Sequence, residues 1–352
     1  MSEQDVTAKV PAADESARVE KATGDEKNQR QSLLHGAAGR NLGLVIALLA
    51  LSIVGVITAG DRFLSVDNLL TILRLAAVLG VLSIGMTFVI TGGGIDLSVG
   101  SVVGLSSVWA STLATQTMAE DTHWLVMVGV ALLVGLGAGI VNGVLIAYGK
   151  VVAFIATLAM MVSARGLAEI IANRQTQVVK VRGFLDFFRS DVLGVPMLVW
   201  IFAVVAVVGW IVLNRTTFGR RTIAVGGNPE AARLAGINVK RHTMYLYALA
   251  GLAAGIGGVM MLGRTTAGSS TNGQYYELDA IAAVVVGGTL LAGGRGTIVG
   301  TVLGVLIFTT LTNVFTQNNV SSSAQNVAKG VIIVVAVLLQ RRIAERSRAG
   351  TT

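Results

Sequence analysis

Apolar runs close to bilayer length alternate with short polar stretches along most of this chain. A helix that crosses a bilayer needs about 20 mostly apolar residues, and several of the runs reach that length. Because backbone groups inside a membrane must be satisfied internally, we predict an all-α polytopic membrane protein with about ten transmembrane helices. Two of the runs, the eighth and the last, are short, so we expect them to be tilted, broken or extended by their neighbours. The runs are roughly Leu42–Ala59, Leu69–Thr91, Leu97–Thr115, Trp124–Ala147, Val151–Ala172, Met197–Leu213, Thr243–Leu262, Asp279–Leu291, Thr297–Thr316 and Ala328–Leu339.

The two ends of the chain differ from this membrane region. Residues 1–40 are polar, mixed in charge and poor in aromatic side chains, which is typical of a disordered tail. They lack the short basic start and early apolar core of a cleavable signal peptide. We therefore expect a cytoplasmic tail at 1–40, a membrane region at 41–340 that contains a polar loop at 215–242, and a basic tail at 341–352.

Lysine and arginine residues are unevenly distributed among the loops, and cytoplasmic loops of membrane proteins carry an excess of both. If the N-terminus is inside, the inner side holds Arg40, Lys150, the cluster 215–241, Arg295 and the basic tail. Most cations of the other side lie in the single loop 173–196. This bias predicts that both termini are cytoplasmic.

Composition supports a membrane protein and excludes several function classes. Charged residues make up 13% of the chain, against about a quarter in soluble domains, and the mean hydropathy is +0.72. The 43 glycines suit helices that pack closely in lipid. Inner loops account for the net charge of +8, so we expect no nucleic-acid partner. The chain has no cysteine and only three scattered histidines, so we expect no catalytic site, metal or cofactor.

A short helix is predicted at the centre of the polar loop, at 228–236. Asn228 can cap its start, Pro229 suits the first helical position and Glu230 favours the positive end of the helix dipole. Gly236 can take the left-handed conformation that ends it. A helix of about two turns needs a surface to lie against. Spacing alone leaves two interpretations open: a helix that docks to a soluble partner, or one that only organises a connecting loop.

The stretch 91–101 interrupts the membrane region with three successive glycines, Asp96 and two serines. Glycines end a helix, and Asp96 or Ser98 can cap the next one. A polar break within a membrane is tolerated where protein or water satisfies its backbone. It predicts either a discontinuous element beside a solute route, as in transporters, or an interfacial cap. Capping already accounts for Asp96 and is the simpler interpretation.

Other polar residues interrupt the apolar runs. Arg165 and Glu169 are four apart, so we expect them to neutralise each other on one helix face. Asn142 is expected to bridge helices or to touch a solute. The glycines at 287–296 lack the glycine-lysine-serine/threonine ending of a phosphate loop, so we predict a tight inner turn and no ATP binding by this chain. The other polar positions within the runs are Arg74, Thr157 and Asn313.

Four stretches together resemble the permease subunit of bacterial ATP-binding-cassette importers for monosaccharides, the family of the ribose transporter permease. The likeness follows the family's order through most of the membrane region. One departure is Val152-Ala153-Phe154, where the family commonly has proline before the phenylalanine. The stretches are GMTFVITGGGIDLSVGS at 85–101, NGVLIAYGKVVAFIATLAMM at 142–161, GGNPEAARLAGINVKR at 226–241 and YELDAIAAVVVGGTLLAGGRGTIVGT at 276–301.

This resemblance implies a homodimer in the bacterial cytoplasmic membrane, a cytoplasmic ATPase subunit that supplies energy, and an extracytoplasmic sugar-binding protein that delivers a monosaccharide. The short polar-loop helix would then couple the permease to the ATPase through Asn228, Pro229, Glu230, Ala231, Arg233, Leu234, Gly236 and Ile237. Candidate wall residues of the sugar path are Asp96, Ser98, Asn142, Phe154, Thr157 and Asn313.

Two other function classes compete with the importer. A stand-alone secondary transporter or channel would explain the spans, but it would leave the docking helix without a role and would need better-placed carboxylates for ion coupling. An intramembrane enzyme ranks last, because the chain offers no metal cluster, no cysteine nucleophile and no suggestive serine–histidine pair.

Overall fold

A computed structural model of the protein describes residues 37–349. The chain divides into two compact units at Gly43, and the described part of the first unit is the opening of helix α2. The second unit, residues 44–352, contains the remaining elements. In chain order the helices are α2 Ala37–Ala59, α3 Asp61–Leu64, α4 Val66–Thr91, α5 Val99–Ala110, α6 Leu113–Asp121, α7 Leu125–Ala147, α8 Ala153–Ile171, α9 Arg182–Arg189, α10 Met197–Arg215, α11 Thr217–Gly227, α12 Pro229–Leu234, α13 Val239–Thr265, α14 Tyr276–Val286, α15 Ile298–Gln317 and α16 Ser322–Ala349.

Seven helices in the described part of the chain are long and apolar enough to cross a membrane, namely α2 from Asn41 onward, α4, α7, α8, α10, α13 and α15. The structure thus confirms a helical, polytopic membrane protein, while the number of crossings stays a prediction. Two of the ten predicted runs form shorter helices: α5 has 12 residues and α14 has 11. The last run forms part of α16.

The third predicted run was expected to continue to Thr115, and the helix ends at Ala110 instead. The Ser111 hydroxyl donates to the carbonyl oxygens of Ser107 and Val108, 2.9 and 3.0 Å away. Such bonds from serine to the preceding turn compete with continuation of a helix. Thr112 then caps α6, where its side chain accepts from the Thr115 amide. Local hydroxyl chemistry therefore splits one apolar run into two helices.

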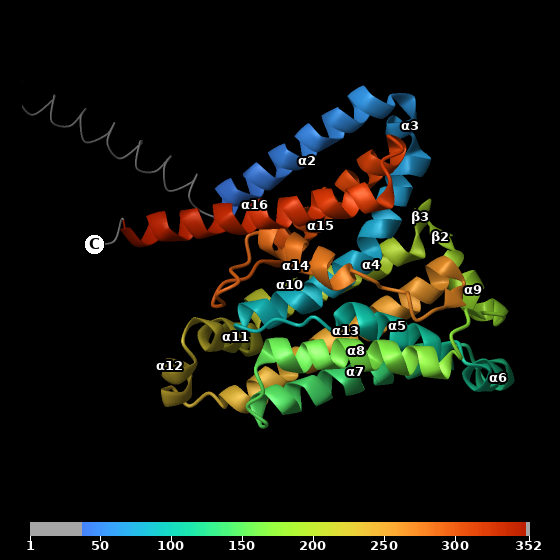
Figure 1. Cartoon of the computed structure of the whole chain (residues 1–352), viewed down its shortest axis with the longest axis horizontal. Coiled ribbons are helices and arrows are strands. Elements are labelled where there is room, and N and C mark those ends of the chain that lie inside the picture. Colours follow the sequence, from blue (N-terminus) through green and yellow to red (C-terminus); the bar gives the residue numbers. More distant parts are fainter. Residues whose placement is uncertain (1–36, 350–352) are drawn as a thin grey trace, which may run out of the picture. The chain divides into compact units, whose positions relative to one another are not determined.

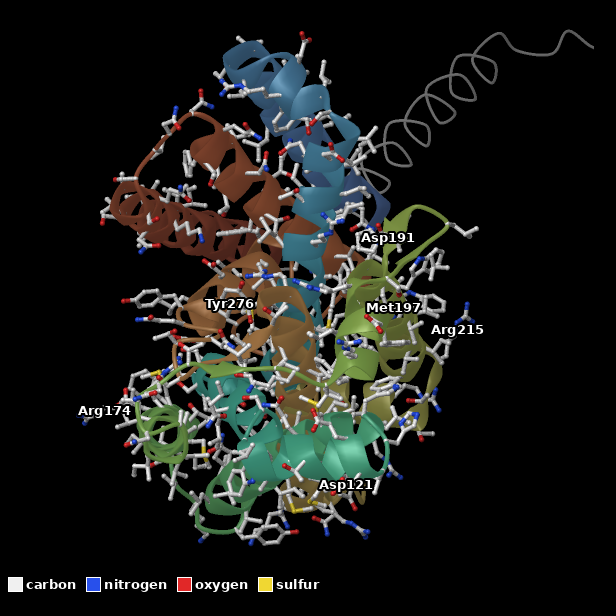
Figure 2. All side chains as sticks on the ribbon, turned by 90° about the vertical axis from the view of Figure 1, so that its right-hand side faces the viewer. Asp121, Arg174, Asp191, Met197, Arg215 and Tyr276 are labelled. Carbon is white, nitrogen blue, oxygen red and sulfur yellow. The ribbon has the colours of Figure 1, made fainter. Side chains whose placement is uncertain are left out.

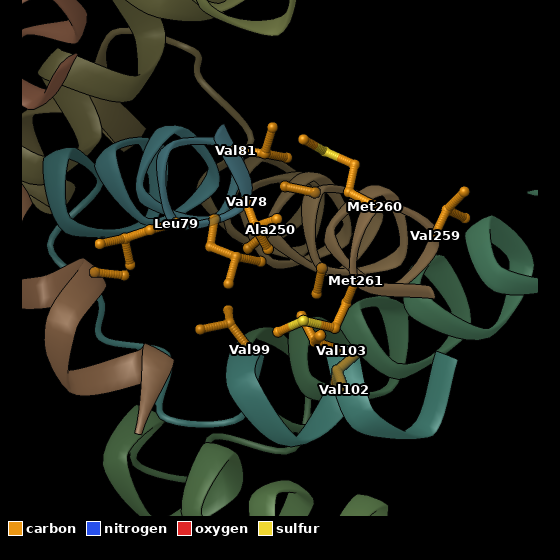
Figure 3. Close-up of a cluster of buried hydrophobic side chains, with 14 of the residues drawn as sticks. Val78, Leu79, Val81, Val99, Val102, Val103, Ala250, Val259, Met260 and Met261 are labelled. Atoms are coloured by element: carbon orange, nitrogen blue, oxygen red, sulfur yellow. The ribbon is translucent and has the colours of Figure 1, made fainter. Parts of the chain in front are cut away.

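Helix α13 lies at the centre of the membrane region, where it packs against α7, α4 and α5. The apolar window of α13 is 83% buried within the chain, against 11% for that of α2. Valines and methionines from three of these helices meet in the core that Figure 3 shows. In a membrane, close packing of this kind replaces the hydrophobic drive between helices.

Glycines allow α7 and α13 to approach closely. A Cβ built on Gly135 would lie 2.6 Å from the Gly255 nitrogen, and one on Gly251 would lie 2.7 Å from the Gly139 Cα. Real Cβ atoms essentially never come that close, so only glycine fits there. The spacing of four residues places these glycines along one face of each helix, as in small-residue packing motifs of membrane proteins.

The polar segments of the second unit gather at two ends (Figure 1). The α11–α12 loop occupies one end, and α6, α9 and the β2–β3 hairpin occupy the other. Figure 2 looks onto the second end, where Asp121, Arg174 and Asp191 are labelled. At this end β1 (Gln177–Val178) pairs antiparallel with β4 (Ala267–Gly268), and β2 (Asp191–Val192) pairs with β3 (Val195–Pro196). Loops that the charge bias assigned to one side of a membrane therefore lie together.

Candidate functional site

The polar loop 215–242 contains the short helix that its sequence predicts. The Asn228 side chain accepts a hydrogen bond from the Ala231 amide at 3.0 Å, and Pro229 occupies the first turn of α12. Gly236 has a φ of +83°, and the Ile237 amide donates to the Ala232 carbonyl at 3.0 Å. This is the left-handed helix end that glycine favours. The predicted cap and stop signals are confirmed.

Within the described part of the chain, one face of α12 is buried and the rest of the helix is exposed. Ala232 is buried at 4% exposure, whereas Leu234 is 79% exposed and Ile237 is partly exposed. The two apolar members of the coupling set, Leu234 and Ile237, therefore lie in different environments. Glu230 and Arg233 form an exposed ion pair at 2.9 Å, which contributes little to stability in water. Helix α12 is therefore rigidly capped and leaves an uncovered leucine at its tip.

Helix α11 carries α12 and is packed against the membrane helices. The Thr222 hydroxyl and the His242 Nε2 lie 2.9 Å apart, and both side chains are buried. The Phe218 ring lies 4.7 Å from the His242 ring and 6.2 Å from the Phe88 ring, measured between centroids. These contacts join α11 to α13 and α4. His242 looks like an unassigned loop histidine in the sequence, and only the fold reveals its packing role.

The Gly-rich stretch forms a true break between α4 and α5. Gly93 has a φ of +84°, and Asp96 is 1% exposed. One Asp96 carboxylate oxygen accepts from the Ser98 amide at 2.9 Å and from the Ser98 hydroxyl at 2.6 Å. Ser98 stands at the N-cap position of α5, but its hydroxyl donates to Asp96 and makes no capping bond. Of the two predicted caps, Asp96 is therefore the residue that organises the start of α5.

Three of the predicted path residues join in one buried network. The Asn142 Nδ2 donates to the Ser98 hydroxyl at 2.9 Å, which links α7 to the break. The Tyr247 hydroxyl of α13 donates to the Ile95 carbonyl at 3.3 Å. Asn142 Oδ1 is buried without a hydrogen-bond partner, and Asp96 has no cation within ion-pair distance among the described residues. An ionisable group buried without a counter-charge is costly in a membrane protein, which makes Asp96 a hypothesis for a functional site.

The other three path candidates, Thr157, Phe154 and Asn313, make no side-chain hydrogen bond to this network in the described part of the chain. The buried Thr157 hydroxyl donates to the Ala153 carbonyl of its own helix at 2.8 Å, and Phe154 is 52% exposed. Asn313 exchanges hydrogen bonds with Asn68 at 2.7 and 3.2 Å. That amide pair joins α15 to α4. Thus Asn313 has the interhelical role that the sequence assigned only to Asn142.

The expected pairing of Arg165 with Glu169 is wrong. Arg165 donates to the carbonyl oxygens of Ser270 and Asn272, and Glu169 lies 3.6 Å from Arg174. No ion pair within 4 Å joins Arg165 to Glu169 in the described chain. Helical spacing places the two side chains on one face, but the guanidinium reaches the carbonyl oxygens of the loop after β4 instead.

One ion pair in the membrane region escaped the sequence analysis. Lys329 of α16 donates to Asp279 of α14 at 2.8 Å, and the two side chains are only 16% and 15% exposed. Both residues stand at the ends of predicted apolar runs, where a charge is unremarkable in a sequence. Their separation of 50 positions left no local signal of pairing.

A polytopic helical bundle with a broken element and a buried polar network is typical of membrane transport components. Comparison with known proteins agrees with this class. Residues 68–338 match the family model described as the permease component of the branched-chain amino acid transport system. The chain belongs to this family of transport permeases.

Several relatives support the assignment over most of the chain. The ribose import permease of Bacillus subtilis (strain 168) is 42% identical over 86% of this chain and 92% of the relative. The L-arabinose permease of Azospirillum brasilense is 37% identical over 87% and 89%, and the galactose/methyl galactoside import permease of Escherichia coli (strain K12) is 35% identical over 84% and 93%. No solved structure matches the chain. The resemblance stated from the sequence is confirmed, and the protein is a multi-pass protein of the bacterial cytoplasmic membrane.

Proposed function

We propose that this chain is the permease subunit of an ATP-driven importer and that it moves a monosaccharide across the cytoplasmic membrane. It would act as a homodimer with a separate cytoplasmic ATPase and an extracytoplasmic sugar-binding protein. The main support for this proposal is that the chain is 42% identical in sequence to a ribose import permease and covers 92% of that relative. In this proposal the chain itself supplies no catalytic residue and binds no metal or cofactor.

A sugar fits better than an amino acid, although the family model's description refers to amino acids. The relatives compared above are named for ribose, L-arabinose and galactose. Uncharged sugars need hydroxyl and amide partners and aromatic faces. The Asp96–Ser98–Asn142 network offers such groups, with one amide oxygen unpartnered. We assign this network to the sugar path, with Phe154, Thr157 and Asn313 as further wall residues.

Helix α12 is proposed as the element that docks to the ATPase. Its cap and stop make it rigid, α11 fixes it to α4 and α13, and Leu234 remains uncovered at 79% exposure. The docking set is Asn228, Pro229, Glu230, Ala231, Arg233, Leu234, Gly236 and Ile237. ATP binding to the partner would shift the permease between outward- and inward-facing states by its differential affinity for the two.

The same proposal assigns an orientation in the membrane and a division of the chain into a membrane region and two tails. The α11–α12 loop and both tails, 1–40 and 341–352, would face the cytoplasm, and 41–340 would form the membrane region. Cation-rich loops favour this orientation. The positions of Arg174 and of helix α9, which carries Arg182 and Arg189, at the opposite end of the second unit agree with it.

Asp96, which has no cation within ion-pair distance among the described residues, favours one second candidate function. Secondary transporters use intramembrane carboxylates to couple solute movement to protons or sodium ions. In that case Asp96 would carry the coupling ion, and the chain would transport without an ATPase.

Reconstitution separates the two functions. The chain is placed in proteoliposomes with its ATPase and binding protein, and uptake of labelled ribose, arabinose, galactose and leucine is measured. The proposal expects sugar uptake only with ATP, and none when the phosphate-loop lysine of the ATPase is replaced. Uptake by the permease alone, driven by an ion gradient, would instead establish the secondary transporter. Uptake of leucine but of no sugar would reject the substrate assignment.

A further inference from the structure

Three glycine segments that lie far apart in the sequence meet at the base of the α11–α12 loop. They are the break after α4, the end of α11 and the turn between α14 and α15. The Gly294 amide donates to the Thr91 carbonyl at 2.8 Å, which joins the turn directly to the last residue of α4. Gly226 lies against both partners. We call Thr91, Gly93, Gly226, Gly293 and Gly294 the glycine junction.

The junction is a backbone-to-backbone contact that leaves no space for a side chain at Gly226, Gly293 or Gly294. A Cβ on Gly226 would collide with the Thr91 carbonyl oxygen and would lie 2.6 Å from the Gly294 nitrogen. A Cβ on Gly293 would lie 2.9 Å from the Gly93 Cα and 2.7 Å from the Gly226 oxygen. Gly93, Gly293 and Gly294 also have positive φ values of 84°, 84° and 76°. Steric space therefore requires glycine at 226, 293 and 294, and backbone conformation favours it at 93, 293 and 294.

The segments that meet are themselves stiff. The Leu290 amide donates to the Arg295 carbonyl at 3.0 Å, and the Gly293 amide donates to the Leu290 carbonyl at 3.0 Å, so the α14–α15 turn is closed on itself. On the other side, Gly226 lies two positions before Asn228, which caps α12. A short run of fixed backbone thus separates the exposed tip of α12 from the junction.

We propose that the glycine junction carries displacement of α12 into both interrupted elements of the membrane region. This inference rests on the proposed coupling role of α12. When the ATPase moves α12, Gly226 pushes on Thr91 and Gly294 together. The first contact leads into the break that holds the Asp96 network, and the second leads into the turn that joins α14 to α15. Packed backbone has little compliance, so the three segments move as one body.

An alternative route would run through α13 alone, because α13 is the helix that follows the polar loop in the sequence. Transmission through α13 would leave the α4–α5 break and the α14–α15 turn to respond indirectly. Through the junction, Gly226 of the polar loop contacts Thr91, the residue directly before the α4–α5 break that holds Asp96. Movement of the loop and opening of the polar break thereby become one event.

The test compares two adjacent glycines in the complete complex with ATPase and binding protein. Gly226→Ala introduces the collision, whereas a Cβ on Gly227 meets only the Gly294 Cα at 3.9 Å, an ordinary contact. We expect Gly226→Ala to reach the membrane and retain the ATPase, but to lose about tenfold or more of its ATP-driven uptake. Gly227→Ala is expected to transport like the wild type. Equal uptake by both variants would overturn the junction's role.

A measurement on the wild-type complex covers the case in which Gly226→Ala misfolds. Hydrogen exchange of peptides that span 290–297 is followed in the nucleotide-free and ATP-bound states. One-body motion keeps the Gly294 amide, which donates to Thr91, equally protected in both states. Loss of that protection in one state means that the segments separate, and it rejects the proposal. Failure of the wild-type complex to transport any sugar would instead reject the function on which the proposal rests.

Discussion

Leu234 is the residue on which the docking assignment can be tested most directly. A single exposed leucine is common on protein surfaces, so its exposure gains meaning from the rigid helix that presents it. We predict that Leu234→Asp reaches the membrane at normal levels but loses both ATPase co-purification and sugar uptake, because the variant would place a charge in a desolvated groove. Leu193→Asp is a matched control, since Leu193 is 88% exposed on the opposite end. Normal assembly of Leu234→Asp would remove α12 from the interface.

Asp96 distinguishes a helix cap from a working residue of the path. Its carboxylate accepts two hydrogen bonds from Ser98, and an asparagine oxygen can accept the same bonds. We expect Asp96→Asn to keep membrane level and ATPase assembly while uptake per permease falls roughly tenfold. Asp96→Ala should in addition lose about 1–3 kcal/mol of stability, because buried donors lose their acceptor. Near-normal uptake by the asparagine variant would leave Asp96 as a cap only.

At the scale of elements, the ion pair between α14 and α16 connects a short helix to its neighbour. Neutralising one partner leaves the other charge buried without compensation. Lys329→Met or Asp279→Asn alone should therefore cost about 3 kcal/mol. The double variant should recover much of that loss. Thermal unfolding in detergent of the wild type, the two single variants and the double variant measures this double-mutant cycle. Additive effects of the two substitutions would show that the pair contributes no coupling energy.

The glycine face between α7 and α13 offers a second test on elements. A Cβ on Gly139 would collide with the Tyr247 carbonyl and lie 3.0 Å from the Gly251 Cα, whereas one on Gly137 meets nothing within 4 Å. Gly139→Ala should destabilise the protein by about 1–3 kcal/mol because the helices must separate. Gly137→Ala should be neutral or stabilising by up to about 1 kcal/mol. Unfolding temperatures of the two variants check the difference, and a stable Gly139→Ala would contradict the close packing.

Local signals predicted elements better than they predicted the ends of elements. The cap and stop of α12 were readable because Asn228, Pro229 and Gly236 act on their own backbone. The end of α5 was missed because it depends on which carbonyls the Ser111 hydroxyl reaches. The Lys329–Asp279 pair was missed for a different reason, since it joins residues that only the fold brings together.

For the whole molecule, the predicted orientation can be tested because the chain contains no cysteine. Single cysteines are introduced at Arg221, on the exposed face of α11, and at the exposed Leu193. In intact cells an impermeant thiol reagent should label Leu193→Cys and spare Arg221→Cys, because cation-rich loops stay inside. Both positions should react once the cells are permeabilised. The reverse pattern in intact cells would invert the topology.

The sequence by itself determined the class of protein, because hydropathy, glycine content and the four family stretches are properties of residues and their near neighbours. It also determined that a rigid helix stands in the polar loop and that a break follows Thr91. Only the tertiary structure decided that Asp96, Ser98 and Asn142 form one network, that Arg165 bonds to the loop after β4, and that three glycine segments meet at Gly226. The physical reason is that hydrogen bonding and backbone contact depend on distance in space. A pattern of spacing places residues on a helix face but does not say which distant segment that face will meet.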